Sequence, residues 1–249
     1  MRLMLRLTAA AIFIAFVGAA PAHAQSFSDA QRHEIEGIVK DYLIAHPEVL
    51  QEIMSEVERR QTAAEAEKQA VGVREHKQEL FNSSHQVTLG NPQGNVTMVE
   101  FFDYNCGYCK RALADMLQLL KTDPNLKVVL KEYPVLGPGS LEAAQVAVAA
   151  RMQDKTGKRY LDFHQRLLGE RGPADKAHAL AAAKEAGFDV ARIEKDLASD
   201  EVTETLKEIM HVADAIGLNG TPSYIIGSEV VVGAQGYAAL KEKVDAARH

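Results

Sequence analysis

Two cysteines, Cys106 and Cys109, are the only thiols in the 249-residue chain, and they lie three positions apart in the segment NCGYCK. Such a pair could form a structural disulfide, part of a metal site or a redox centre. A disulfide closing so short a loop stabilises a fold far less than the ~3 kcal/mol of a fifteen-residue loop. Structural zinc takes four ligands, and the nearest histidines, His85 and His164, lack ligand-like spacing. We therefore expect a redox centre with no metal and no other cofactor.

The elements expected around the pair support this interpretation. The segment VTMVEFF, residues 96–102, predicts a buried central strand, and CKRALADMLQLLK predicts an amphipathic helix. Cys106 then falls where strand gives way to helix, and the free amides and positive dipole end of the helix stabilise a thiolate there. A thiolate attacks disulfides, and Cys109, one turn later, can displace whatever Cys106 has captured. The spacing predicts thiol–disulfide exchange.

Strand and helix patterns alternate through the rest of this region, which indicates a mixed α/β domain. We expect an edge strand over 85–89, a turn over 90–95, a strand over 126–133, helices from 140 to about 216, closing strands in PSYIIG and EVVVGA, and a final helix over 237–247.

The front of the chain predicts helices of a different kind. Residues 28–60 show apolar positions at helical spacing, with Ser28 or Asp29 as the cap and an interruption at His46-Pro47. Two short helices cannot bury their apolar stripes on each other, so they must dock on the rest of the chain or on another copy. Residues 61–84 read as a solvated helix or semi-rigid linker with Gly72 as a weak point, or else as a surface helix of one compact domain.

The first residues have the pattern of a secretory signal. Arg2 and Arg6 precede an apolar run that ends in PAHAQ, which predicts a signal peptide over 1–24, cleaved after Ala24. An uncleaved anchor is the alternative, although the run is short for a membrane span. We expect the mature protein in an oxidising compartment such as a bacterial periplasm. Removing residues 1–24 takes away two arginines and no acid, so the net charge changes from −6 to −8, which disfavours nucleic acid as a partner.

At the cysteine pair the sequence resembles a known family. The stretch VEFFDYNCGYCK is similar to the active site of DsbA-type periplasmic thiol–disulfide oxidoreductases, and GTPSYIIG matches their cis-proline loop, with Thr221 before Pro222. The resemblance implies an α/β thioredoxin fold over residues 85–249, with a DsbA-type helical insertion over about 138–216, preceded by an all-α N-terminal segment over 25–60.

The resemblance also implies roles for residues at the site. Glu100 matches the buried acid beneath the cysteines, and Lys131 matches its partner lysine; together they would transfer the proton that exchange requires. Thr221 and Pro222 would bind an extended client strand through backbone groups. Gly107 and Tyr108 are also expected to bind substrate, with Tyr108 lining an apolar rim for unfolded clients; Tyr104 is either a second rim residue or a core tyrosine.

The dipeptide between the cysteines departs from the strongest oxidant of the family, which has proline and histidine there. Gly107 and Tyr108 bring no positive charge, so we predict a less stabilised thiolate and a less oxidising pair. The sequence CGYC and the threonine before the cis-proline also match the disulfide isomerase DsbC, but only at these motifs.

A further resemblance concerns the front segment. The stretch IEGIVKDYLIAHPEVLQEIMSEVERRQ is similar to the N-terminal segment of ScsC-type proteins, which are associated with copper tolerance. In that group the segment drives self-association, so the resemblance implies a homo-oligomer, a trimer or a dimer.

Three functions follow as hypotheses. The first is an oligomeric disulfide isomerase or reductase that acts on unfolded or misdisulfided exported proteins and is kept reduced by a DsbD-like membrane partner. The second is a monomeric DsbA-like dithiol oxidase that is reoxidised by a DsbB-like membrane partner. The third is a copper(I)-binding protein, because soft thiolates suit that ion.

Overall fold

The computed structural model describes residues 27–154 and 156–248, which form two compact units divided after Val57. The expected signal peptide, residues 1–24, lies outside the described residues. Within the described part, no helix is both long and apolar enough to cross a bilayer.

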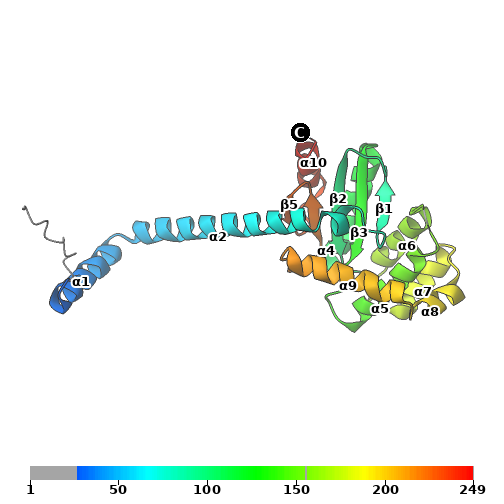
Figure 1. Cartoon of the computed structure of the whole chain (residues 1–249), viewed down its shortest axis with the longest axis horizontal. Coiled ribbons are helices and arrows are strands. Elements are labelled where there is room, and N and C mark those ends of the chain that lie inside the picture. Colours follow the sequence, from blue (N-terminus) through cyan, green and yellow to red (C-terminus); the bar gives the residue numbers. More distant parts are fainter. Residues whose placement is uncertain (1–26, 155, 249) are drawn as a thin grey trace, which may run out of the picture. The chain divides into compact units, whose positions relative to one another are not determined.

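A five-stranded sheet lies at the centre of the second unit (Figure 1). Its strands lie in the order β1-β3-β2-β4-β5. Central β2 pairs in parallel with β3 and antiparallel with β4, and the outer strands β1 and β5 are also antiparallel to their neighbours. The strands are β1 (Val87–Gly90), β2 (Val96–Phe102), β3 (Leu126–Glu132), β4 (Ser223–Ile226) and β5 (Glu229–Val232). The predicted central strand over 96–102 and the edge strand before it are confirmed.

Helices cover both faces of the sheet, because alternate residues of the buried strands are apolar on each side. On one face, Met98 and Phe102 pack with α4 (Gly107–Thr122), α10 (Tyr237–Ala246) and the helices of the insertion. On the other face, Val99 and Phe101 pack with the end of α2 (Pro47–Glu75), with α3 (Lys77–Phe81) and with α9 (Asp200–Ala215), the last helix before β4.

The helical insertion between β3 and β4 confirms the helices predicted from 140 to 216. It consists of α5 (Pro138–Arg151), α6 (Lys158–Gly169), α7 (Lys176–Glu185), α8 (Val190–Asp196) and α9 (Asp200–Ala215). Asp175, Asp189 and Ser199 cap α7, α8 and α9 with their side-chain oxygens, which fixes where each helix begins.

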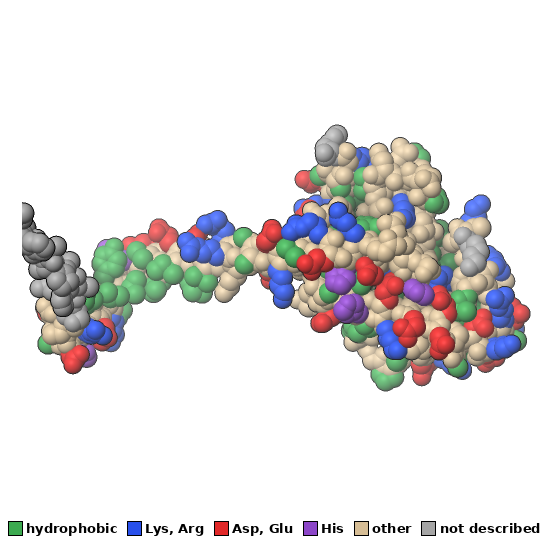
Figure 2. Space-filling view, viewed as in Figure 1, with side chains coloured by type: hydrophobic (Ala, Val, Ile, Leu, Met, Phe, Trp, Pro, Cys, Tyr) green, Lys and Arg blue, Asp and Glu red, His purple; other side chains and the backbone are tan. Residues whose placement is uncertain are grey.

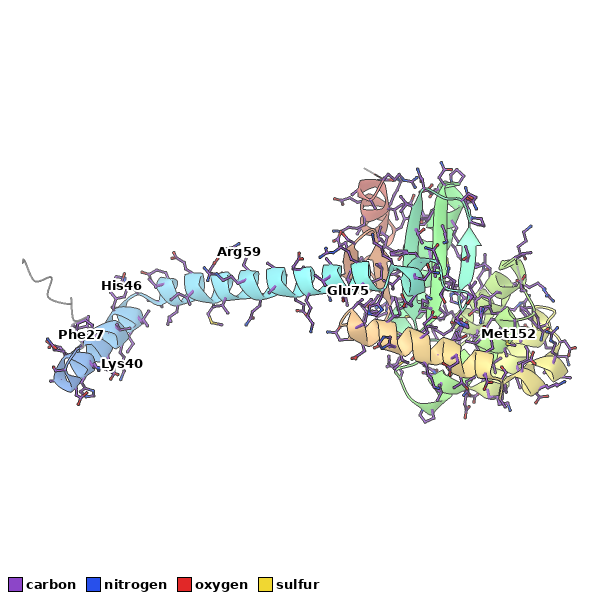
Figure 3. The ribbon with its side chains drawn as sticks, viewed as in Figure 1. Phe27, Lys40, His46, Arg59, Glu75 and Met152 are labelled. Atoms are coloured by element: carbon purple, nitrogen blue, oxygen red, sulfur yellow. The ribbon has the colours of Figure 1, made fainter. Side chains whose placement is uncertain are left out.

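The front of the chain forms the predicted interrupted helix. Helix α1 (Asp29–Ala45) begins at a capping box between Ser28 and Gln31, and α2 (Pro47–Glu75) starts at a proline, which suits a first helical turn. No residue of α1 is buried. Exposed apolar side chains therefore gather over α1 and the first half of α2 (Figures 2 and 3). They include Ile35, Ile38, Val39, Tyr42, Ile44, Leu50, Ile53, Met54 and Val57.

The predicted weak point at Gly72 does not bend the helix, since α2 is continuous from Pro47 to Glu75. A Cβ at Gly72 would lie 3.0 Å from the backbone oxygen of Ala215, at the end of α9, so the glycine permits close packing there. Val73 and Leu80 are also buried in this contact. The end of the stretch 61–84 is thus part of the second unit, where it packs against α9 and the sheet.

Candidate active site

The two cysteines lie at the start of α4. Cys106 is the N-cap residue in extended conformation, and its amide donates to the Asp103 carbonyl at 3.0 Å. Cys109 lies within the first turn and has no exposed surface, whereas the Cys106 side chain retains 6% exposure. Both cysteines are thus buried at the strand-to-helix junction, and only Cys106 of the two retains some exposed surface.

The loop before β4 lies directly against the Cys106 sulfur. The peptide bond between Thr221 and Pro222 is cis, and Cys106 Sγ donates to the Thr221 carbonyl oxygen at 3.1 Å. The Gly233 amide donates to the Pro222 carbonyl at 2.8 Å, which ties the loop to the end of β5. The structure thus brings together four predicted site residues, Cys106, Cys109, Thr221 and Pro222, from two distant parts of the chain.

Glu100 is buried in β2, on the same face of the sheet as the cysteines. The residue opposite Glu100 in the neighbouring strand β4 is Tyr224, which is also buried. Burial raises the pKa of Glu100 to about 8; the nearby Asp115 carboxylate adds to this, and the Tyr224 hydroxyl partly opposes it. Among the described residues, Glu100 Oε2 has no hydrogen-bond partner. The carboxyl group is therefore mainly protonated at neutral pH and can exchange its proton.

The inner thiol is held in its protonated form. Burial raises the pKa of Cys109 far above its ordinary value, and the neighbouring Cys106 and Glu100 add to the effect. The Asp103 backbone and the Thr221 side chain oppose it only in part. Cys109 therefore needs a proton acceptor before it can act as a nucleophile.

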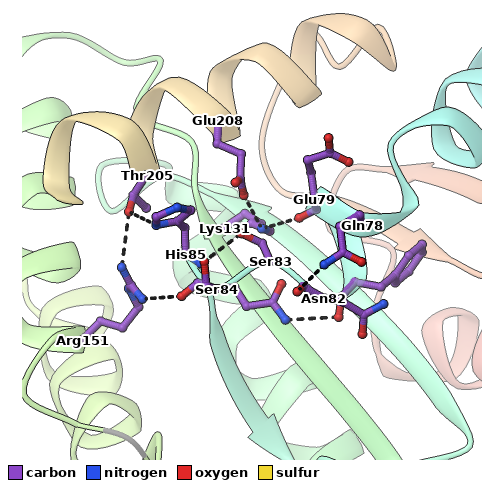
Figure 4. Close-up of polar contacts among 12 residues, drawn as sticks. Gln78, Glu79, Asn82, Ser83, Ser84, His85, Lys131, Arg151, Thr205 and Glu208 are labelled. Atoms are coloured by element: carbon purple, nitrogen blue, oxygen red, sulfur yellow. Dashed lines mark hydrogen bonds and ion pairs between the residues drawn. The ribbon is translucent and has the colours of Figure 1, made fainter. Parts of the chain in front are cut away.

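Lys131 does not lie with Glu100, in contrast to the prediction. In the parallel register Glu100 is opposite Leu130, so Lys131 points to the other face of the sheet. There its Nζ donates to the Glu79 carbonyl at 2.7 Å and pairs with Glu208 at 3.5 Å (Figure 4). Burial lowers the pKa of Lys131, and the Glu208 carboxylate opposes this. Lys131 thus joins β3 to α3 and α9.

Two polar residues that the sequence analysis missed hold the cysteine turn in place. The buried Asp103 carboxylate accepts the amides of Asn105, Val135 and Leu136 at 2.8, 2.9 and 3.0 Å. Asn105 Nδ2 donates to Ser140 Oγ and the Ala174 carbonyl, and its Oδ1 accepts the Ala174 amide. The turn is thereby bonded to the loop after β3 and to the helical insertion. A short polar run between a buried strand and the cysteines was the available signal.

Comparisons with known proteins agree with this arrangement. Residues 97–245 match the DSBA-like thioredoxin domain family. The chain belongs to that family. Its thioredoxin fold with a helical insertion is therefore as the resemblance implied. Residues 31–64 match the copper resistance protein ScsC N-terminal domain.

Solved structures similar to this DSBA-like chain cover most of its length. A thioredoxin-like oxidoreductase from Silicibacter pomeroyi is 42% identical, with a TM-score of 0.65, over 69% of this chain and 97% of that protein. The thiol–disulfide exchange protein alpha-DsbA2 from Wolbachia pipientis is 30% identical, with a TM-score of 0.68, over 74% and 97%. ScsC from Proteus mirabilis, in a transitional conformation, is 27% identical, with a TM-score of 0.65, over 90% and 97%.

Curated relatives match about two thirds of this chain as part of longer proteins. A protein named Na(+)/H(+) antiporter NhaA 1 from Salinispora arenicola is 28% identical over 160 residues, which are 64% of this chain and 24% of that protein. The chain therefore spans about a quarter of the length of these relatives.

The aromatic residues near the cysteines of the DSBA-like domain divide into core and surface. Tyr104 is buried, so it belongs to the core and not to a rim; its hydroxyl lies 3.2 Å from that of Tyr160 and 3.3 Å from His164 Nδ1. Tyr160 in turn donates to the buried Glu132. Burial lowers the pKa of His164 to about 3, so its ring is neutral and packed.

Tyr108, by contrast, is 59% exposed beside the cysteines. The guanidinium of Arg111 lies 4.4 Å above the centre of its ring. Lys110 Nζ donates to the carbonyls of Glu170 and Gly172 at 3.0 and 3.1 Å. The positive charges of Lys110 and Arg111 thus lie on the first turns of α4, where they contact the helical insertion and the Tyr108 ring. Among the described residues, no group of three or more His, Cys, Asp or Glu could hold a metal ion.

Proposed function

We propose that this protein is an oligomeric thiol–disulfide oxidoreductase that acts as a disulfide isomerase or reductase on exported proteins. The observation that carries the proposal is the position of Cys106, which is the N-cap residue of α4 and whose Sγ donates a hydrogen bond at 3.1 Å to the carbonyl before the cis-proline Pro222. Family membership supports thiol–disulfide exchange as the reaction. A periplasmic location rests on the predicted signal peptide and on one neighbour, a periplasmic thioredoxin-like protein from Salmonella enterica.

In the proposed reaction the Cys106 thiolate attacks one sulfur of a client disulfide. The client S–S bond breaks, a Cys106–client mixed disulfide forms, and the departing client sulfur leaves as a thiolate that takes up a proton. In isomerisation that client thiol, or another, attacks the mixed disulfide and restores the Cys106 thiolate, so no net oxidation occurs.

In reduction the inner cysteine completes the reaction. Cys109 loses its proton to the ionised fraction of Glu100 and attacks Cys106 Sγ, so the client leaves as a second thiol. The two protein thiols are oxidised to a disulfide, and the client disulfide is reduced to two thiols. The chain then needs an external dithiol, which we assign to a DsbD-like membrane partner.

Thr221 has the position expected of a client-binding residue. Its carbonyl oxygen already accepts a hydrogen bond from the reacting sulfur, and the loop continues into strand β4. An extended client segment would add beside this loop through backbone hydrogen bonds. This places a client cysteine next to Cys106 without selecting particular side chains.

The uncovered apolar face of α1 and α2 supports self-association through these helices. Within the described part of unit one, residues 27–57, these large apolar side chains are exposed on helices with little else to bury them. Copies joined there would hold several catalytic domains near one client, which raises the effective concentration of thiols around it. The match of residues 31–64 to the ScsC N-terminal domain supports the same proposal.

A trapping experiment tests the exchange activity. Cys109→Ala, expressed in the periplasm of a bacterial host, should accumulate mixed disulfides between Cys106 and exported proteins, and Cys106→Ala should accumulate none. Refolding of scrambled ribonuclease, compared with oxidation of reduced ribonuclease, then separates isomerase from oxidase. Absence of trapped clients would contradict the proposal, and tight copper(I) binding in competition with a chelator would favour the metal-binding alternative.

A further inference from the structure

The carboxyl group of Glu100 has almost no contact with solvent of its own. Glu100 is 2% exposed, and its neighbours on the same face of β2, Met98 and Phe102, lie in the apolar core. If Glu100 takes up the Cys109 proton, it must release that proton before it can act again. Lys131, the partner that the resemblance implied, lies on the other face of the sheet. A polar group on the Glu100 face therefore has to carry the proton outward.

Tyr224 is the first such group. It lies directly opposite Glu100 in the antiparallel pair of β2 and β4, and residues in such positions have Cβ atoms about 4.5–5.5 Å apart on one face of a sheet. The Tyr224 hydroxyl and Glu100 Oε2 are both buried, and neither has a hydrogen-bond partner of ordinary geometry among the described residues. Burial raises the pKa of Glu100, and the Tyr224 hydroxyl is close enough to oppose this. A small side-chain rotation is therefore sufficient to join the two groups.

Asp115 lies where this layer meets solvent. It is half-buried on α4, between the exposed Ala114 and the buried Met116, which belongs to the same core as Tyr224. Burial is the largest cause that raises the pKa values of Glu100 and Tyr224, and the Asp115 carboxylate is near enough to add to both. A half-buried carboxylate exchanges protons with water directly, so Asp115 is a suitable outlet.

The other surroundings of Glu100 favour this path. Among the residues that the structure describes, the titratable groups that face Glu100 are the Tyr224 hydroxyl on β4 and the Cys109 thiol and Asp115 carboxylate on α4. Burial raises the pKa of Tyr224, so its hydroxyl stays neutral and passes a proton on without holding a charge. The buried residues that β3 and α10 place in this layer are apolar: Leu130, Leu240 and Val244.

We propose that the Tyr224 hydroxyl and the Asp115 carboxylate carry the proton of Glu100 to solvent. The proposal rests on the proposed exchange function, in which Cys109 gives its proton to Glu100. The Glu100 carboxyl group donates its proton to the Tyr224 oxygen while the hydroxyl proton of Tyr224 passes to the Asp115 carboxylate, which releases it to water. One proton leaves, Glu100 is ionised again, and Tyr224 is unchanged. When an external dithiol reduces the disulfide, the same path supplies a proton in the opposite direction.

The Ellman reagent separates the two steps of exchange, because each step releases one thionitrobenzoate anion. The first anion leaves when Cys106 of the reduced full chain attacks the reagent, and the second when Cys109 attacks the resulting mixed disulfide. About nine tenths of Glu100 is protonated at pH 7, since its pKa is about 8, so its proton must leave before Cys109 can react. The second release therefore reports on the path, and the first does not.

Tyr224→Phe removes only the hydroxyl from the path. We expect it to leave the first release unchanged and to slow the second about tenfold at pH 7. Tyr237→Phe is the matched control, because it removes the hydroxyl of another tyrosine that packs on the same core, 3.2 Å from Thr122 Oγ1. It should change neither rate.

Asp115→Asn separates proton transfer from the effect of charge. Burial and the Asp115 carboxylate both raise the pKa of Glu100, so loss of the carboxylate leaves more Glu100 ionised at pH 7. A purely electrostatic role would thus make the second release faster. Loss of the outlet has the opposite effect, and we expect the second release to be about threefold slower. Asp162→Asn, at an exposed acid on α6, is the control and should change neither rate.

The outcomes distinguish this proposal from the proposed function. If no anion is released, or if Cys106→Ala releases it as fast as the wild type, the exchange function is wrong. If both anions are released but Tyr224→Phe and Tyr237→Phe behave alike, the path through Tyr224 is wrong. A faster second release in Asp115→Asn would overturn the outlet. A first release slowed together with the second would show a general distortion of the site and would also contradict the proposal.

Discussion

The side chain of Asp103 accepts the backbone amide of Leu136 at 3.0 Å, although 33 residues separate the two along the chain. The same carboxylate oxygen accepts the amide of Val135, and the other accepts that of Asn105. One buried acid thus holds the cysteine turn and the loop after β3 in a common arrangement.

Removal of this acid should therefore affect both stability and exchange. We expect Asp103→Ala to lower the free energy of unfolding by about 2–4 kcal/mol, because three amides lose their acceptor. Asp103→Asn should recover part of this, since one amide oxygen remains. Urea unfolding measures the effect. Asp162→Asn, at an exposed acid on α6, is the control, and equal losses for the two sites would contradict the assigned role.

Glu100→Gln should slow the second step of reduction and spare the first. The Cys109 thiol is protonated at neutral pH, so its attack depends on a nearby proton acceptor, and loss of such a group costs about 10²-fold. Rapid acid quench should show the mixed disulfide forming at the wild-type rate and persisting. The wild-type rate of resolution should rise with pH and level off near 8, the pKa of Glu100. An unchanged pH profile in Glu100→Gln would exclude this role.

The raised pKa of Glu100 also predicts how the stability of the fold depends on pH. Folded Glu100 keeps its proton up to about pH 8, whereas the unfolded carboxyl loses it near the ordinary glutamate pKa of 4.5. The unfolded state therefore binds fewer protons between these values, and this group destabilises the fold increasingly as pH rises through that range.

Glu100→Gln should thus match the wild type near pH 4 and exceed its stability by a few kcal/mol at pH 8. Buried His164 has the opposite effect, because it destabilises the fold as pH falls below 6.5. Since both proteins contain His164, its contribution cancels when the stability of the wild type is subtracted from that of the variant. Urea titrations across this range, with Glu142→Gln as an exposed control, measure it. A constant difference would show that Glu100 does not titrate in this way.

Charge on the apolar face of the front helices should dissociate the oligomer. Ile38→Asp and Met54→Asp each place a charge on an exposed apolar position. Sedimentation should then show monomers, and the rate at which the protein refolds scrambled ribonuclease should fall. The reaction of Cys106 with a small disulfide, the mixed disulfide of N-acetylcysteine amide and 5-thio-2-nitrobenzoate, should be unchanged. Gln51→Asp, at an exposed polar position of α2, should retain the oligomer. A wild-type monomer at micromolar concentration would contradict self-association.

Arg111 should influence which small disulfides react with Cys106. Its guanidinium lies over the ring of the exposed Tyr108, two residues after Cys106 in the sequence, and attracts anions. Arg111→Gln should slow the reaction with the dianionic Ellman reagent about threefold at low salt and leave that with neutral dithiodipyridine unchanged. Lys121→Gln, at the far end of α4, is the control. An equal effect on both reagents would indicate a structural role instead.

Much of the fold follows from local sequence pattern. The strand over 96–102 and the helix after it could be predicted from the spacing of their apolar residues, because the side chains at those positions are the ones that the folded domain buries. The break at His46-Pro47 follows from proline chemistry. Gly72 was misjudged as flexible because its reason is a close contact with Ala215, which local pattern does not reveal.

The candidate site was predictable only where a motif specifies it. The cysteines and the Thr221-Pro222 loop have sequence motifs, and the structure brings them together. Lys131 was assigned to Glu100 from the family resemblance, but a one-residue difference in parallel register places it on the opposite face of the sheet. Asp103 and Asn105 act through partners 32 to 69 residues away, which no local pattern encodes.

Cys109 has no exposed surface, and Cys106 has a little. Of the two thiols in the chain, a thiol-specific reagent in solution consequently meets that of Cys106 first. A fast, thiol-specific fluorophore added to living cells would label this chain only where Cys106 is reduced and vacant at that instant. The unlabelled fraction would then report, without any engineered tag, how heavily the protein is occupied by its clients or by its own disulfide.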